Sequence, residues 1–129
     1  TSTPMDEALK KELAKDCDGL LTYEYIANHI DTCTDMMSDL VDNMIRVDLT
    51  GQFMVSAARY LAAINRDGFK ADIDRLVAAS IDRDRERKFI ADLLPSLWGV
   101  DYADHVVELA EADNNFRRIY KRVVSSSAI

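Results

Sequence analysis

Two histidines and two cysteines are the side chains of this sequence best suited to bind a transition metal. His29 and Cys33 are four residues apart, so a helix would present both on one face, and Cys17 and His105 could complete a Cys2His2 set. However, the sequence has no CxxC or HxxxH pair, and the four ligands would come from three separate segments. His105 and Glu108 have di-iron spacing but stand in the reverse of the Glu-x-x-His order. We therefore expect no metal and no cofactor.

The same cysteines are the candidate nucleophiles, and their surroundings argue against catalysis. A reactive thiolate needs positive charge nearby, whereas Asp16 and Asp18 flank Cys17 directly and Cys33 lies in the same acidic third of the chain. The sequence contains neither a glycine-rich phosphate loop nor a Gly-x-Ser-x-Gly elbow. It thus predicts no catalytic residues, and no small-molecule substrate is evident.

The N-terminal third carries all of the net charge of −7. Between Asp16 and Ile45 there are seven acidic residues and no Lys or Arg. If this region formed one continuous helix, Glu24 and four aspartates would lie on the face opposite the apolar residues. The four aspartates are candidates for partner binding: Asp31, Asp35, Asp39 and Asp42. Like charges at this spacing cost about 0.2–0.5 kcal/mol per pair. The acidic stripe is therefore either a solvated face or a surface for a basic partner.

Half of the sixteen Lys and Arg residues fall in two short clusters. The first cluster is Arg83, Arg85, Arg87 and Lys88, and the second, also a candidate for partner binding, is Arg117, Arg118, Lys121 and Arg122. Three explanations of the second cluster stay open: it complements the dipole of its own helix, docks a protein or binds nucleic acid. The acidic pI of about 4.7 and the acids within the first cluster weaken the nucleic-acid explanation.

Helical spacing of apolar residues runs through the chain, and no segment alternates like a strand. In residues 22–47 the spacing 4, 3, 4, 3, 4, 3 predicts one long helix, with a seam of Ile26, Ile30, Cys33, Met37, Leu40, Met44 and Val47. The same spacing predicts a second long helix over 101–124, where Asp113 interrupts the seam. We expect a kinked single helix there; the alternative is that Asp113 caps a new helix.

Shorter helices complete the expected fold. They cover residues 4–15, with Thr3 as the N-cap, then 52–65 and 69–81, and the charged run 82–88 begins another that extends to 98. The Ala and Ser content of 52–65 would let another helix approach closely. The sequence predicts a single all-α domain over 1–129, a bundle of about five to seven helices around the two long ones, with 1–3 and 125–129 as frayed tails. No repeat of 20–50 residues is visible.

These patterns favour a binding protein over an enzyme. No apolar run reaches the roughly 18 residues that cross a bilayer, so no membrane is expected, and two cysteines do not make a disulfide scaffold, so we expect a cytoplasmic protein. We interpret the chain as a small intracellular protein-interaction or adaptor module without catalytic activity, which binds an unidentified protein or forms a homodimer. The alternative is a nucleic-acid-associated regulatory protein that uses Arg83–Lys88 and Arg117–Arg122. We expect the self-association of this chain, or its binding to a partner, to weaken as the salt concentration rises.

Overall fold

The computed structural model describes the backbone of residues 6–127 and the side chains of residues 6–124, and this part of the chain contains no strand. It has eight α-helices, one more than the upper end of the predicted range, and three short 3₁₀ turns. The α-helices are α1 (Glu7–Ala14), α2 (Leu20–Asn28), α3 (Met37–Val47), α4 (Gln52–Asn65), α5 (Lys70–Arg83), α6 (Leu93–Trp98), α7 (Val106–Ala112) and α8 (Asn114–Ser127). The predicted all-α class is confirmed.

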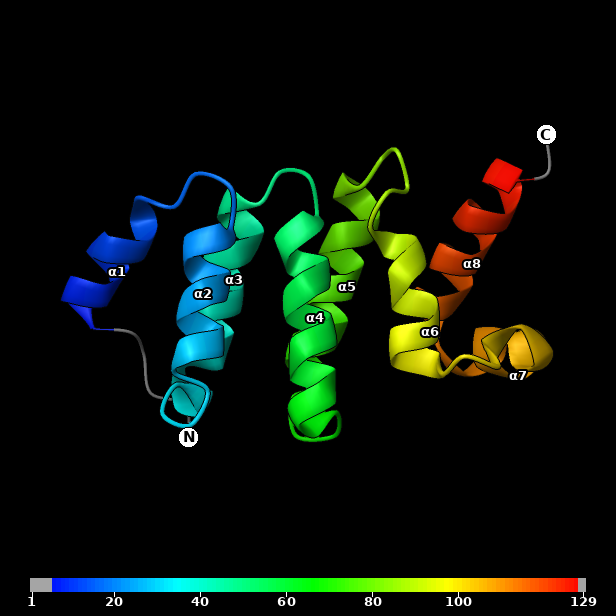
Figure 1. The fold of residues 1–129 in the computed structure, drawn as a ribbon, viewed down its shortest axis with the longest axis horizontal. Helices are drawn as coiled ribbons and strands as arrows, with labels where there is room; N and C mark the ends of the chain where they lie inside the picture. Colours follow the sequence, from blue (N-terminus) through cyan, green and yellow to red (C-terminus); the bar gives the residue numbers. More distant parts are fainter. Residues whose placement is uncertain (1–5, 128–129) are drawn as a thin grey trace.

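Consecutive helices joined by a short connection, α1 with α2, α3 with α4, α5 with α6 and α7 with α8, are here called hairpins, and they follow one another along a two-layered row (Figure 1). The helices α2, α4 and α6 form a front layer, in which α4 packs against both neighbours, and α3, α5 and α8 form a back layer, in which α5 does the same. Helix α1 lies at one end of the row, and α7 lies across the foot of α8 at the other. The connections 15–19, 48–51 and 84–89 and the C-terminal end of α8 lie along one side, here called the loop edge.

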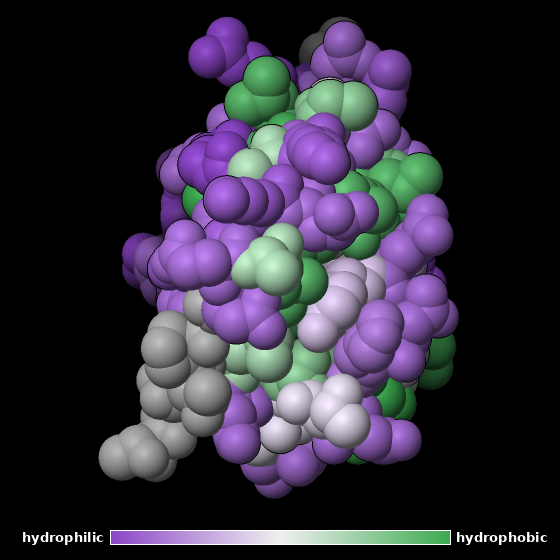
Figure 2. Space-filling model, turned by 90° about the vertical axis from the view of Figure 1, so that its left-hand side faces the viewer, coloured by the Kyte–Doolittle hydropathy of each residue, from purple (hydrophilic) through white to green (hydrophobic). Residues whose placement is uncertain are grey.

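The two layers enclose one hydrophobic core. Its most deeply buried large side chains come mainly from α3, α4 and α5 and include Met37, Leu40, Met44, Met54, Leu61, Leu76 and Ile81. The predicted burial of Cys33 and Met37 is confirmed. The end of the row formed by α1 is mostly hydrophilic, with apolar side chains gathered in a strip down its middle (Figure 2). Because the core residues come from helices of both layers, the core lies between the layers.

The prediction of one helix over 22–47 is wrong, because the chain turns between α2 and α3. The carbonyl of His29 accepts hydrogen bonds from the backbone N–H groups of Thr32 and Cys33, at 2.9 and 2.8 Å. The hydroxyl of Thr32 also donates to this carbonyl, at 3.3 Å, which is the kind of local bond that competes with a helix. A 3₁₀ turn, Thr34–Met36, then leads into α3. The seam spacing survives this turn because both helices face the same core, so periodicity alone could not reveal the break.

The predicted single helix over 101–124 is also wrong, and the alternative of a cap at Asp113 is confirmed. After a 3₁₀ turn, Tyr102–His105, α7 ends and α8 begins on either side of Asp113. The Asp113 Oδ1 atom accepts hydrogen bonds from the backbone N–H groups of Asn115 and Phe116, at 2.9 and 3.3 Å. Its Oδ2 atom accepts one from the indole of Trp98, at 3.2 Å. The polar residue in the seam thus caps α8 and binds it to α6.

Three smaller boundary predictions also differ from the structure. The expected cap at Thr3 lies outside the described residues, and Asp6 instead caps α1 by accepting a hydrogen bond from the Leu9 N–H at 2.8 Å. The charged run 82–88 does not begin a helix, because its first two residues end α5 and the rest form a connection. The expected tail 1–3 is outside the described residues, and the backbone of 125–127 continues α8.

A fully buried carboxylate, Asp48, organises the connection between α3 and α4. One of its oxygens accepts hydrogen bonds from the N–H groups of Thr50 and Gly51, at 3.0 and 2.9 Å. The other accepts from those of Phe53 and Met54, at 2.9 and 2.8 Å, in the first turn of α4. Gly51 has a φ of +90°, a conformation that L side chains rarely adopt. The carboxylate therefore satisfies the N-terminus of α4 and fixes the turn before it.

An aspartate that accepts backbone hydrogen bonds recurs at the connection within each of the four hairpins. Asp16 is buried and accepts hydrogen bonds from three backbone N–H groups and the Thr22 hydroxyl at the start of α2. Asp84 is buried and accepts from three backbone N–H groups before α6. With Asp48 and Asp113, these residues recur at intervals of 32, 36 and 29 residues. The repeat lies in one residue type at one structural position, which self-similarity of sequence does not detect.

Polar side chains tie successive hairpins together at the loop edge. The Asn43 amide donates to the Leu13 carbonyl at the end of α1, at 3.2 Å. Arg83 donates to the carbonyls of Ile45 and Asp48 at the end of α3, the second at 2.6 Å. Each of these helix ends therefore finds donors for its last carbonyls in the next hairpin of the row.

Removal of the Asp48 carboxylate should destabilise the fold strongly. The Asp48→Ala variant loses five hydrogen bonds, four of them from backbone N–H groups, and leaves donors of α4 without a partner, so its free energy of unfolding should fall by about 2–4 kcal/mol. Asp31→Ala, at an exposed carboxylate, should change it by less than about 0.5 kcal/mol. Urea unfolding followed by circular dichroism measures both. Equal losses in the two variants would contradict the capping role.

Asp16 should contribute a pH-dependent share of the stability. Burial alone would raise the pKa of its carboxyl, but hydrogen bonds from Thr22, Gly19 and Asp18 outweigh burial and hold this pKa below its usual value. The contribution is therefore complete above the unfolded-state pKa of about 3.9 and is lost as the pH falls from there through the lower folded-state pKa. Asp16→Asn should be less stable than the wild type at neutral pH and should lose less stability between about pH 6 and pH 3. Parallel slopes in urea unfolding of the two proteins would refute this.

Candidate interaction surface

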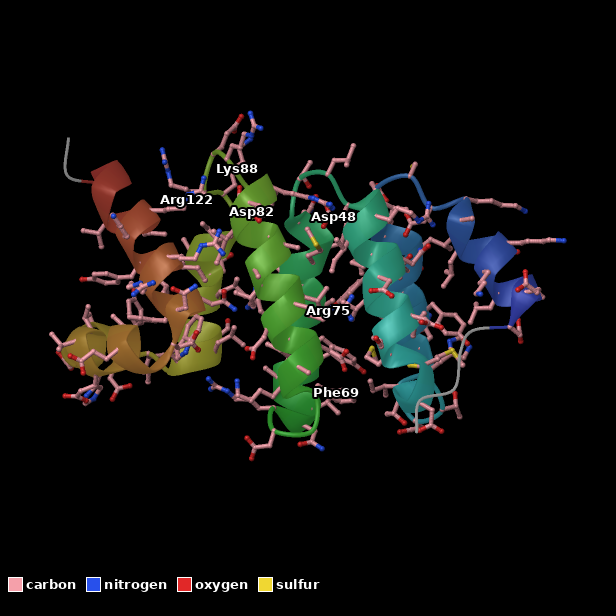
Figure 3. All side chains as sticks on the ribbon, turned by 180° about the vertical axis from the view of Figure 1, so that it is seen from behind. Asp48, Phe69, Arg75, Asp82, Lys88 and Arg122 are labelled. Carbon is pink, nitrogen blue, oxygen red and sulfur yellow. The ribbon has the colours of Figure 1, made fainter. Side chains whose placement is uncertain are left out.

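The predicted acidic stripe does not form, because its residues lie on different elements. Asp31 lies in the turn after α2 and Asp35 in the following 3₁₀ turn, and both are exposed as expected. Asp39 and Asp42 are on α3; Asp39 is half-buried, against expectation, and Asp42 pairs with Arg75 of α5. Arg75 also donates to the Ser38 hydroxyl at 3.2 Å and points from α5 towards α3 (Figure 3). Asp42 therefore connects two helices of the back layer.

The two cationic clusters come together at the loop edge, but much of their charge is bound within the fold. Arg118 of α8 pairs with Asp82 of α5 at 2.8 Å, and Arg122 donates to the Ile81 carbonyl at the end of α5. Lys88 pairs with Glu86 at 2.8 Å. Figure 3 shows Asp48, Asp82, Lys88 and Arg122 towards this one edge.

The structure argues against one explanation of the second cluster, namely that its cations complement the dipole of their own helix. The dipole explanation relied on acids in the first half of the predicted helix 101–124, namely Asp101, Asp104, Glu108 and Glu111. These acids lie before α8, from the residue preceding the 3₁₀ turn to α7, whereas the cations lie on α8, which begins at Asn114. Arg117 and Arg118 are thus near the positive N-terminal end of α8, so they do not complement its own dipole. Arg122 instead lies at the negative C-terminal end of α5. Arg118 and Arg122 join the last hairpin to its neighbour.

A hollow of about 520 Å³ opens at the loop edge between the connections 48–51 and 84–89. Its walls mix both signs of charge with the apolar side chains of Leu49 and Phe89. The charged lining residues are Asp82, Arg83, Asp84, Arg85, Glu86 and Lys88. Because Arg83 and Asp84 are engaged in caps, this hollow offers little net charge to a ligand.

A second hollow, of about 500 Å³, lies on the outer surface of the front layer and has no carboxylate in its lining. It is here called the front hollow. Helix α4 supplies most of it, α2 supplies Tyr23 and α6 supplies Ser96; the residues from α4 are Ser56, Arg59, Tyr60, Ala62, Ala63 and Arg66, the last just past its end. Arg59 and Arg66 are exposed, and neither makes a hydrogen bond or ion pair with a residue that the structure describes. They are cations that the fold does not use.

Small and aromatic side chains shape the rest of the front hollow. Ser56, Ala62 and Ala63 leave the space between the two arginines open. The rings of Tyr23 and Tyr60 meet edge to face at 6.5 Å, and the Tyr60 hydroxyl donates to the Ala27 carbonyl at 3.4 Å. The aromatic side of the hollow is therefore held in place by contacts between α2 and α4.

Sequence reasoning missed Arg59 and Arg66, although a signal was present. Both lie on the outward face of α4 with Gln52, Ser56 and Ala63, at spacings of 4, 3, 4 and 3. The apolar spacing of the same segment predicts a different face, made of Phe53, Ala57, Tyr60, Leu61 and Ile64, and the last of these is half-exposed. The Ala and Ser content that suggested close approach of a helix belongs partly to this open face.

The candidate metal ligands do not form a site in the described part of the chain. Cys33 is buried and its thiol lies near the Ile26 carbonyl, whereas Cys17 is exposed at the loop edge. His29 stacks on Tyr25 with ring centroids 4.1 Å apart, and among residues 6–124 no group of three or more His, Cys, Asp or Glu side chains could hold a metal ion. Nor is any described helix long and apolar enough to cross a bilayer. Neither a family model, nor a curated protein, nor a solved structure matches the chain significantly.

Arg122 should matter for stability more than the adjacent lysine does. Arg122→Ala removes a donor from the last turn of α5 and a half-buried side chain, and should lower the free energy of unfolding by about 1–2 kcal/mol. Lys121→Ala, at an exposed position, should change it by less than about 0.5 kcal/mol. Urea unfolding provides the comparison. If the two variants were equally stable, the tie between α8 and α5 would be refuted.

Proposed function

We propose that this chain is a protein-interaction module without catalytic activity and that it binds its partner on the front layer. One observation carries the proposal: the front hollow holds two exposed arginines, Arg59 and Arg66, that no described residue engages. On a chain of net charge −7, cations within reach of carboxylates usually pair with them, as Arg75, Lys88 and Arg118 do. Arginines left unpaired beside tyrosines have the composition of an interaction surface.

The fixed position of α4, which supplies most of the front hollow, supports this proposal. Helix α4 is the central helix of the front layer, its N-terminus is fixed by Asp48, and its inner face is buried against α5. A surface on a rigid helix loses little conformational entropy when a partner binds. Rows of helical hairpins also present extended surfaces to which several helices contribute, as α2, α4 and α6 do here.

The thiols favour binding over catalysis. Burial raises the pKa of the Cys33 thiol and therefore opposes the thiolate that a nucleophile needs. Cys17 is exposed, but the neighbouring Asp16 carboxylate is held ionised by its hydrogen bonds. Neither cysteine has the electropositive surroundings of a catalytic residue.

One observation favours the second candidate, a nucleic-acid-associated regulatory protein. The clusters Arg83–Lys88 and Arg117–Arg122 lie along the same edge, although they are far apart in sequence. Against it, Asp82 and Glu86 pair with cations of these clusters, and Arg83 and Arg122 are occupied with helix ends. The protein-interaction function is better supported, and a cytoplasmic location and a homodimer stay predictions.

Site-specific cross-linking tests the proposed function. A photoreactive amino acid at Ala63, inside the front hollow, should form an adduct with a protein in cells that produce this chain, because a docked partner would lie against it. The same amino acid at Ala71, an exposed position on α5 of the back layer, is the matched control and should give little adduct. Equal adducts at both positions, or none at Ala63, would overturn the assignment of the front layer.

A further inference from the structure

We propose that the front hollow binds an extended acidic segment of a partner protein, with two carboxylates on one side about 10 Å apart. This inference rests on the proposed function and names the chemistry of the partner. It follows from three properties of the hollow: the spacing of its arginines, the sign of its lining and the size of the side chains between the arginines.

The arginines set the spacing of the charges that the ligand must carry. Arg59 and Arg66 are seven residues apart at the outer face of α4, which corresponds to two helical turns, or about 10 Å along the axis. Guanidinium groups pair with carboxylates, as they also do with phosphates, through two parallel hydrogen bonds. A segment in polyproline II conformation rises about 3.1 Å per residue and returns to the same side every third residue. Acidic residues at positions i and i+3 of such a segment would therefore reach both arginines.

The sign of the lining makes the hollow selective for an acidic ligand. No carboxylate lines it, whereas the loop-edge hollow contains three, Asp82, Asp84 and Glu86. The chain as a whole is negative, at −7, so an acidic segment is attracted to a place such as the front hollow, where two cations stand without an acidic neighbour in the lining. Complementary charge of this kind sets the position and the association rate of a partner.

The small side chains make room for the backbone of the ligand. Ser56, Ala62 and Ala63 of α4 and Ser96 of α6 lie between or beside the arginines, so a chain can approach the helix closely. Tyr23 and Tyr60 provide an aromatic side for an apolar residue between the two acids. The volume of about 500 Å³ suits a few residues of extended chain rather than a whole helix.

Many of the chain's own acidic residues are poorly suited to this role. Asp16, Asp48 and Asp84 are buried in caps, and Glu108 and Glu111 lie on the helix α7. Asp42, Asp74 and Asp82 pair with cations of the same chain. We assign the occupant to another protein; a second copy of this chain, whose exposed acids include Asp31, Asp35, Asp101 and Asp104, is an outcome that the experiment must separate.

Peptide selection with matched charge variants tests the inference. A random library of peptides of about 12 residues is selected on the wild-type protein and on Arg59→Glu/Arg66→Glu. The control is Arg85→Glu/Arg87→Glu, which changes the net charge equally at exposed loop-edge side chains that no described residue engages. Wild type and control should enrich peptides with two acids three residues apart, and the front-hollow variant should not.

Synthetic peptides then give the magnitude of the effect. A selected peptide should bind the wild type in the micromolar range and bind Arg59→Glu/Arg66→Glu at least about tenfold more weakly. The control should differ from the wild type by less than about threefold, and raising the salt from about 50 to about 500 mM should weaken binding several-fold. A peptide with lysines in place of the two acids should bind the front-hollow variant better than it binds the wild type. Circular dichroism melting confirms that both variants are folded.

The possible contrary results separate this inference from the proposed function. Enrichment of neutral or basic peptides, with an adduct still formed at Ala63, would overturn the acidic ligand and leave the interaction module in place. Failure of both selection and cross-linking would overturn both. Two further results would replace the acidic protein segment by another class of ligand: binding of single-stranded RNA, or dimerisation in sedimentation experiments, that Arg59→Glu/Arg66→Glu abolishes.

Discussion

An aspartate that accepts backbone hydrogen bonds from the residues leading into the next helix is the interaction on which the described hairpins depend, and in three of the four it is buried. Asp48 has no exposed surface, and burying a carboxylate is costly unless it is fully hydrogen-bonded. Four N–H groups satisfy its oxygens, and the N-terminal end of the α4 dipole adds favourable potential. The carboxylate and the turn therefore stabilise each other, and the direction of α4 relative to α3 follows from that turn.

Because this cap recurs at one edge, the helices of the front layer run in the same direction. Because Asp16, Asp48 and Asp84 lie at the loop edge, the helices α2, α4 and α6 all begin there and run in the same sense through the front layer. The ends of α1, α3 and α5 lie at that same edge, where Asn43, Arg83 and Arg122 donate to their last carbonyls. The loop edge is thus where the hydrogen bonding between hairpins is concentrated, and its cations Arg83, Lys88, Arg118 and Arg122 are engaged within the fold.

Because some cations are engaged within the fold and others are not, the surface charge should be interpreted from the pairing of each side chain. Sequence clusters of cations, such as Arg117–Arg122, attract attention because they are dense, yet two of those four side chains are tied to α5. Arg59 and Arg66 are inconspicuous in the sequence because seven residues separate them, and the helix brings them to one open face. Unpaired charge on a fixed surface, rather than density of charge along the chain, is what marks the front hollow as the better candidate.

The sequence by itself determined the helical class and most of the core. Spacing of apolar residues is a local property that directly reflects helical geometry, so the burial of Cys33, Met37, Leu40 and Met44 followed from it. The breaks after α2 and at Asp113 did not, because helices on both sides of a turn can face one core and keep the same spacing. Asp113 was recognisable as a candidate cap, but only its bonds to Asn115, Phe116 and Trp98 decide between a cap and a kink. The predicted acidic stripe does not form, because the single helix over 22–47 that would have placed its residues on one face is broken between α2 and α3. Which cations pair within the fold, and which face of α4 stays open, depends on contacts between residues about 20 to 40 positions apart, and such contacts exist only in the tertiary structure.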